Sequence, residues 1–195
     1  MGYDKGLRTR EEILDAAGRL VFVRGYAASS FSEITTALGI SLGKITHHFP
    51  NKAALFEALF EQAVRYFRTE TLPILEDVEL SPSQRIERVF SEIETFYAAQ
   101  GDIIGCPVGQ TIGDPLTTTA AMRDLAAAVL ADTERLLTKN LVEMGWQAEQ
   151  AASRAAIVTA AWQGAVLFAR GGGGIDGFRR ILSHIRALLA EAPRG

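Results

Sequence analysis

Apolar residues recur along most of the chain three or four positions apart, which is the spacing of an α-helix. No long run alternates apolar and polar residues as a half-buried strand would. The pattern therefore predicts an all-α protein of about nine helices with no internal repeat. The longer helices are predicted at residues 8–24, 52–70, 82–100, 117–144, 148–170 and 175–191. Residues 101–115, broken by four Gly and two Pro, are predicted to form a short irregular helix between loops.

Two further short helices, joined by a tight turn, are predicted between residues 29 and 52. Ser30 can cap the first helix, and Glu33 stands at the spacing of a capping box. Gly39 suits the left-handed conformation that ends a helix. Ser41 can cap the second helix, which Pro50 ends. A helix, a Gly-containing turn and a second helix make up the helix-turn-helix motif, whose second helix enters the major groove of DNA.

Composition narrows the class of protein. The chain has 195 residues, 48% of them hydrophobic, which supports a sizeable core and argues against disorder. No apolar run is long enough to span a membrane, and the charged first residues lack the apolar segment of a secretion signal. The single Cys106 excludes an internal disulfide framework and fits a reducing cytoplasm.

The charge is distributed unevenly, although the net charge of −3 does not by itself suggest a nucleic-acid partner. Residues 1–52 carry seven Lys/Arg against five Asp/Glu, whereas the remaining residues carry 13 against 18. The N-terminal segment is therefore where a phosphate would be best received, and the asymmetry permits DNA binding without requiring it.

The hydrophobic pattern also divides the chain into two parts. The first three helices need one another to bury their apolar faces, so residues 1–50 are expected to form a DNA-binding head. Residues 51–195 are expected to form a larger helical domain.

Small residues repeat every four positions on the helix predicted at residues 148–170, and the last helix has a continuous apolar face. Two such helices can form half of a four-helix bundle completed by a second subunit, or they can belong to an intramolecular core. The pattern alone favours neither. The residues that would form a dimer interface are Ala156, Ala160, Gly164, Phe168, Phe178, Ile181, Leu182 and Ile185.

Residues 10–55 resemble the DNA-binding head of the TetR/AcrR family of bacterial transcriptional regulators. The residues that carry this resemblance, in order and spacing, are Ile13-Leu14-Asp15-Ala16-Ala17, Phe22, Gly25-Tyr26, Phe31, Ile34, Ala37, Gly39-Ile40-Ser41, Gly43, His48-Phe49 and Lys52. The resemblance implies a homodimer that binds a palindromic operator, represses a promoter and is released when a small molecule enters the C-terminal domain. A shorter likeness, at residues 105–109, is to a branch of the family that answers to aromatic ligands.

Within the head, the resemblance and the motif together indicate which side chains meet DNA. Lys44, Leu42 and His47 are the candidates for reading base edges. The remaining candidates cap the helices, allow close approach or contact phosphates, and they are Ser30, Ser41, Gly43, Thr46, His48 and Lys52. The family usually has Tyr where this chain has Thr46, which keeps a hydroxyl but loses reach.

An effector site would be built from aromatic and apolar residues of the middle helices, although the pattern at each of them favours ordinary core. These residues are Phe67, Phe90, Phe96, Tyr97, Cys106, Met122, Leu125 and Trp162. Cys106 can be a pocket residue, a redox-sensitive thiol or a small buried hydrophobe.

Two rival functions remain open at the level of sequence. The first is an enzyme or binding module that merely retains the head. No segment carries a nucleophile, a base and an orienting group together, and adjacent His47 and His48 point too far apart to bind one metal ion, so we expect no catalysis, metal or cofactor. The second is a regulator that activates transcription, or that bends DNA without a ligand.

Overall fold

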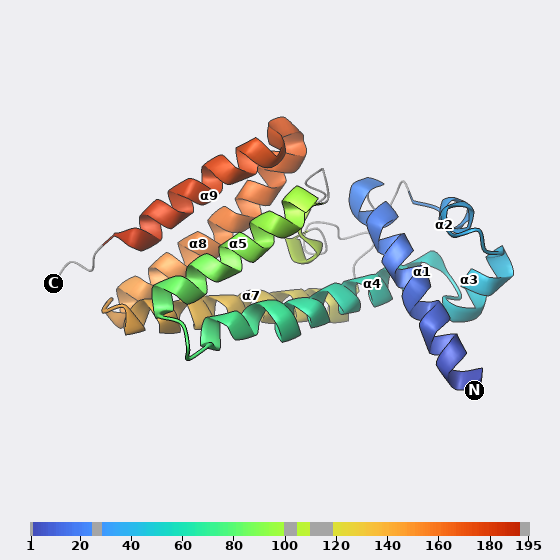
Figure 1. The fold of residues 1–195 in the computed structure, drawn as a ribbon, viewed down its shortest axis with the longest axis horizontal. Coiled ribbons are helices and arrows are strands. Elements are labelled where there is room, and N and C mark those ends of the chain that lie inside the picture. Colours follow the sequence, from blue (N-terminus) through green and yellow to red (C-terminus); the bar gives the residue numbers. More distant parts are fainter. Residues whose placement is uncertain (1, 25–28, 100–104, 110–118, 192–195) are drawn as a thin grey trace. The chain divides into compact units, whose positions relative to one another are not determined.

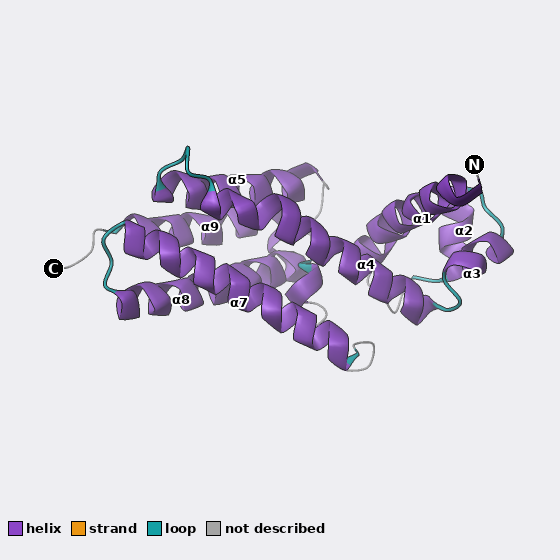
Figure 2. Ribbon diagram, turned by 90° about the horizontal axis from the view of Figure 1, so that it is seen from below, coloured by secondary structure: helices purple, strands orange, loops and turns teal. Residues whose placement is uncertain are grey.

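The computed structural model describes residues 2–24, 29–99, 105–109 and 119–191, and every regular element in these ranges is helical (Figures 1 and 2). This confirms the all-α prediction. The elements are α1 (Gly2–Arg24), α2 (Phe31–Leu38), α3 (Leu42–His48), α4 (Lys52–Tyr66), η1 (Phe67–Thr71), η2 (Leu72–Glu76), α5 (Pro82–Ala99), α7 (Ala120–Glu143), α8 (Ala148–Phe168), η3 (Ala169–Gly173) and α9 (Gly174–Ala190). The irregular helix predicted at residues 101–115 lies mostly outside the described residues.

The chain divides into two compact units, Met1–Ala63 and Val64–Gly195, so α4 contributes to both. The first unit has its own core, in which residues of α1, α2, α3 and the first turns of α4 pack together. The buried members of this core are Ile13, Leu14, Ala17, Val21, Ile34, Ile45, Phe49, Leu55, Ala58 and Leu59. Burial of such side chains, at about 1.5–3 kcal/mol each, is what allows helices as short as α2 and α3 to persist.

The end of α4 differs from the single helix predicted at residues 52–70. The α-helix stops at Tyr66, a π-helical turn follows at η1, and a 3₁₀ turn follows at η2. Pro73 lies in the first turn of η2, where it has no backbone N–H to donate and its ring would clash with a continuing α-helix. The change of helical register accommodates this proline.

In the second unit, α8 packs against both α7 and α9, and α5 contacts α7 and α9 (Figure 1). Their facing side chains form one continuous core. Phe178, Leu182 and Ile185 of α9 are among its buried members. The apolar face of the last helix is therefore occupied within the protomer.

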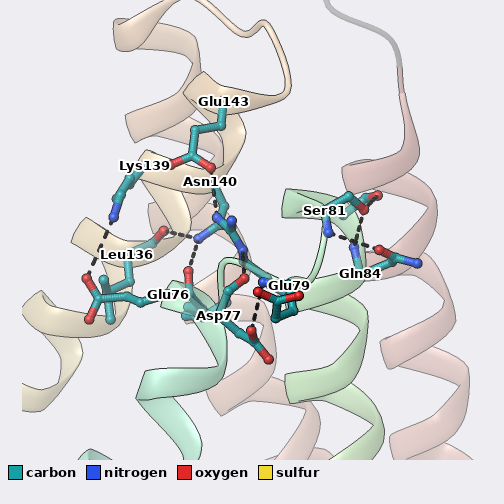
Figure 3. Close-up of polar contacts among 12 residues, drawn as sticks. Glu76, Asp77, Glu79, Ser81, Gln84, Leu136, Lys139, Asn140 and Glu143 are labelled. Carbon is teal, nitrogen blue, oxygen red and sulfur yellow. Dashed lines mark hydrogen bonds and ion pairs between the residues drawn. The ribbon is translucent and has the colours of Figure 1, made fainter.

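A buried polar cluster connects the turn between η2 and α5 to α7 by hydrogen bonds (Figure 3). The guanidinium of Arg85 is buried, and its Nε donates to the carbonyl of Asp77 at 2.6 Å. Its Nη1 donates to Glu143 Oε2 at 2.7 Å and to Asn140 Oδ1 at 3.3 Å. Asn140 in turn donates from Nδ2 to the carbonyl of Leu75 at 2.9 Å. Because each buried polar group has a partner, the cluster fixes the start of α5 without an uncompensated charge.

Within the described residues, no helix is both long and apolar enough to cross a bilayer.

Candidate nucleic-acid interface

Local hydrogen bonds hold α2 and α3 in the predicted helix-turn-helix arrangement. The hydroxyl of Ser30 accepts the backbone N–H of Glu33 at 3.2 Å, and the Glu33 carboxylate accepts the Ser30 backbone N–H at 2.9 Å. Gly39 ends α2 with a φ of 62°, in the left-handed region that glycine enters without steric cost. Ser41 Oγ caps α3 by accepting from the N–H of Lys44 at 3.3 Å. The predicted capping box and both caps are therefore confirmed.

Helix α3 has one face in the core and one face in solvent. Ile45 is fully buried and Phe49, which follows the helix, is 2% exposed. The opposite face is exposed and consists of Leu42, Gly43, Lys44, Thr46 and His47. Leu42, which begins the helix, is 56% exposed. An exposed helix face that combines a glycine with basic and apolar side chains has the chemistry to enter a DNA groove.

The hydroxyl of Thr46 is hydrogen-bonded within α3. Its Oγ1 donates to the carbonyl of Leu42 at 3.0 Å and lies 3.3 Å from that of Gly43. A hydroxyl has one proton, so it must rotate away from these carbonyls before it can donate to a phosphate.

Positive charge gathers beside the end of α3. The pKa of His48 is lowered below its ordinary value of 6.5 by partial burial and then by the neighbouring charges of His47, Arg10 and Lys44. The Arg10 guanidinium lies over the Phe49 ring, 5.1 Å from its centroid. The pattern of the sequence did not identify Arg10 as a site residue, because only the packing of α1 on α3 brings it there.

The start of α4 supplies another group of candidates. Asn51 Oδ1 accepts the N–H of Ala54 at 2.9 Å and so caps the helix, a role that the Asn51-Lys52 sequence is compatible with but that was not predicted. Lys52, the first residue of α4, is half-buried. A lysine at the N-terminus of a capped helix sits where an anion is favoured.

A metal centre is not supported by the described residues, in which no group of three His, Cys, Asp or Glu could hold an ion. The rings of His47 and His48 meet edge to face, 5.1 Å apart.

Among the residues predicted for an effector site, the structure brings three aromatic rings together in the second unit. The Trp162 indole of α8 lies 5.7 Å from the Phe67 ring of η1 and 6.5 Å from the Phe90 ring of α5. Trp162 and Phe90 are buried, whereas Phe67 is half-buried.

The other predicted effector-site residues are spread more widely. Tyr97 is buried, donates its hydroxyl to the carbonyl of Gly105 at 3.4 Å, and has a pKa raised by burial and by Cys106. Cys106 Sγ accepts from Gln163 Nε2 at 3.6 Å. Phe96 is 47% exposed. On α7, Met122 is buried and Leu125 half-buried, and neither belongs to the core cluster that holds Trp162.

The residues predicted for a dimer interface fall into two sets. Phe178, Leu182 and Ile185 are between 0% and 3% exposed within the protomer, so they cannot present a surface to a partner. Ile181 is half-buried. The stripe of small residues, in contrast, is exposed on α8, beside three large apolar side chains that are 49–73% exposed. The stripe is Ala156, Ala160 and Gly164, and the large side chains are Ile157, Leu167 and Phe168.

Comparison with known proteins finds a matching family model for each of the two units. A family model for "Bacterial regulatory proteins, tetR family" matches residues 13–59, and a model for "Transcriptional regulator LmrA/YxaF-like, C-terminal domain" matches residues 82–184. The HTH-type transcriptional regulator LmrA of Bacillus subtilis (strain 168) is 24% identical over 160 residues, which cover 82% of this chain and 85% of that protein.

Two solved structures support the same fold. A TetR transcriptional regulator from Legionella pneumophila has a TM-score of 0.76 and 25% identity, covering 91% of this chain and 92% of its own. A TetR-family regulator from Agrobacterium tumefaciens has a TM-score of 0.80 and 22% identity, covering 93% and 97%.

Proposed function

Because this chain belongs to the TetR family of DNA-binding transcriptional regulators, we propose that it binds a palindromic operator as a homodimer and represses the adjacent promoter in the bacterial cytoplasm. A small apolar or aromatic effector releases it. The observation that carries this proposal is the exposed face of α3, which presents Leu42, Gly43 and Lys44 on a helix anchored by Ile45.

The proposed division of labour on DNA follows from the chemistry of each side chain. Lys44 and His47 can donate to base acceptors in the major groove, and Leu42 can contact a thymine methyl group. Gly43 allows the helix backbone to approach closely. Phosphates would be bound by His48, by Lys52, by Thr46 after its hydroxyl rotates, and by backbone N–H groups beside the caps Ser30 and Ser41.

The proposed dimer rests on the exposed stripe of α8. Small side chains let a second helix approach closely, and the flanking Ile157, Leu167 and Phe168 would lose contact with water. A palindromic operator matches the two-fold symmetry of such a dimer. In this scheme residues 1–50 bind DNA with the help of Lys52 at the start of α4, and the rest of residues 51–195 binds effector and partner.

Release of the protein from DNA by the effector is a shift between two conformational states of the dimer, one that fits the operator and one that does not. The ligand must bind more tightly to the state in which the two heads do not fit the operator, because a ligand with equal affinity for both states shifts nothing.

The proposal is tested by a mobility shift with the intergenic DNA upstream of the gene, at two salt concentrations and with excess nonspecific competitor. We expect a competitor-resistant complex that weakens steeply with salt. Lys52→Ala should weaken binding and lower the salt slope by about one. Lys139→Ala, on α7, removes the same charge from an exposed ion pair with Glu76 and is the matched control. Unchanged operator affinity of Lys52→Ala at every salt concentration would contradict the assigned docking.

A further inference from the structure

Arg10, on α1, is a half-buried cation of the head without an acidic neighbour in contact with it. Among the described side chains, no Asp or Glu forms an ion pair with its guanidinium. In the second unit, by contrast, Arg68, Arg85 and Arg154 each form an ion pair with a carboxylate. An arginine held partly out of water without a counter-charge indicates a place where an anion can bind.

The position of Arg10 on α1 explains its partial burial. Ile13, Leu14 and Ala17 follow it at the i+3, i+4 and i+7 positions, so the four residues share one face of the helix. The three apolar side chains are between 0% and 2% exposed and belong to the core of the head. At the N-terminal end of this buried row, an arginine can pack its methylene groups on the core and keep its guanidinium at the surface.

The Phe49 ring holds the guanidinium beside the end of α3. The guanidinium lies 5.1 Å from the ring centroid, and Phe49 directly follows α3 and is only 2% exposed. Because the ring is fixed in the core, the cation–π contact restricts where the guanidinium can go. A side chain that is already positioned loses less conformational entropy when it binds a ligand.

Positive groups from two helices meet at this place. Partial burial lowers the pKa of His48, and the charges of its neighbours lower it further: His47, Arg10 and Lys44. The charge of Arg10 on α1 therefore acts on an imidazole of α3. An anion bound between the guanidinium and the imidazole would relieve this repulsion.

We propose that Arg10 and His48 together bind one backbone phosphate of DNA, so that α1 takes part in the interface beside α3 and α4. This inference rests on the proposed function and deepens it, since it adds a residue of a further helix to the phosphate contacts. A guanidinium can donate two parallel N–H bonds to phosphate oxygens, and an imidazole N–H can donate another. Because Phe49 links Arg10 to the end of α3, the contact would also set the register of α3 in the groove.

The first test measures the salt dependence of DNA binding by the full chain. Arg10→Gln is compared with wild type on the upstream intergenic DNA and on a random-sequence duplex of the same length. We expect a loss of about tenfold at low salt on both duplexes, and a salt slope that is less steep by about one. Arg10→Lys should restore the slope but only part of the affinity, since an ammonium cannot donate in the bidentate geometry.

A matched control and a folding measurement separate phosphate binding from a structural role. Arg65→Gln removes the same charge from an exposed position about 20 Å along α4 from Lys52, and it should leave the salt slope unchanged. Circular dichroism melting shows whether each variant folds. If Arg10 only stabilised the head, its loss would lower the melting temperature and weaken binding by the same factor at every salt concentration.

The second test locates the phosphate. Single phosphates of the footprinted intergenic DNA are replaced in turn by neutral methylphosphonate. At one position in each half-site we expect wild type to lose about tenfold in affinity and Arg10→Gln to lose little more, because the partner is already gone. His48→Gln should show the same coupling at the same position. In the unbound protein, Arg10→Gln should raise the pKa of His48 in an NMR titration.

Three results would overturn the inference: an unchanged salt slope in folded Arg10→Gln, losses that add at every methylphosphonate, or coupling of Arg10 and His48 to different phosphates. The proposed function is judged separately by wild-type protein. A preference for intergenic over random DNA with an unchanged slope in Arg10→Gln would remove only the phosphate contact. A changed slope on both duplexes without such a preference would keep the contact and remove the assigned operator.

Discussion

At the scale of single residues, the end of α3 combines a basic environment with an imidazole that can take up a proton. Partial burial and the charges of His47, Arg10 and Lys44 lower the pKa of His48 from 6.5, which favours the neutral imidazole in the unbound protein. A phosphate would favour the protonated form.

From this we predict that operator affinity rises as the pH falls from 7.5 to 6, by at most about tenfold per pH unit for one proton taken up. The rise should level off once His48 is already protonated in the unbound protein. Fluorescence anisotropy with labelled operator measures this pH dependence of the affinity. His48→Gln should flatten the profile, while His47→Gln tests the neighbouring imidazole; an unaltered profile in His48→Gln would exclude this residue as the source.

Gly43 gives a second prediction at the same scale. A Cβ at this position meets nothing within 4 Å, and the residue is exposed on α3. Gly43→Ala should therefore leave the melting temperature unchanged or raise it, since alanine favours a helix by about 1 kcal/mol over glycine. Operator affinity should fall by about tenfold or more if the backbone approaches DNA there. Wild-type operator affinity in Gly43→Ala would show that the α3 backbone does not approach DNA closely at this position.

At the scale of elements, ion pairs join α5 to α9. Arg186 donates from Nε to Glu87 at 2.9 Å and from Nη1 to Glu94 at 3.2 Å, and Arg179 Nε donates to Glu94 at 2.9 Å. Burial alone would raise the pKa of Glu94, but the hydrogen bonds from Arg179 and Arg186 bring it below its ordinary 4.5.

Arg186→Gln should lower the free energy of unfolding by about 1 kcal/mol at pH 7, because these pairs are partly exposed and screened. A carboxyl with a depressed pKa stabilises the fold fully above its unfolded pKa and loses that contribution as the pH falls through the folded pKa. Urea denaturation between pH 3 and pH 7 should therefore show a shallower acid loss in the variant. An Arg88→Gln control removes an exposed i,i+4 pair with Glu92 within α5 and should cost less.

At the scale of the whole molecule, the dimer proposed from α8 depends on surface shape. A Cβ at Gly164 meets nothing within 4 Å in the protomer, so a larger residue is accommodated by the fold itself. Its exposed position in the stripe makes the same residue a barrier to a partner helix.

Gly164→Arg should therefore preserve helicity and melting of the protomer and weaken the dimer by at least tenfold in sedimentation velocity measurements. Binding to a full palindrome should fall more than binding to a half-site, since only the former uses both heads. Ala128→Arg, at an exposed position of α7, is the matched control. A variant that sediments as a stable dimer would move the interface elsewhere.

Sequence by itself determined where the two short helices of the head, α2 and α3, begin and end, whereas α1 begins at Gly2 and not at the predicted residue 8. Ser30, Glu33, Gly39 and Ser41 act on groups within four residues of themselves, so spacing alone carries their roles. The same local logic predicted the bounds of most long helices to within a few residues and the exposed face of α3. It missed the π-helical turn at η1, where Pro73 and tertiary packing together set the register.

Tertiary structure decided which of several apolar faces is used within the protomer. The periodicity of α9 is the same whether its face meets α5 and α8 or a second subunit, and only the packed core assigns Phe178 to the protomer. Arg10 reaches Phe49 and Trp162 reaches Phe67 across long separations in the chain. Such contacts depend on how distant segments pack, which no local spacing encodes.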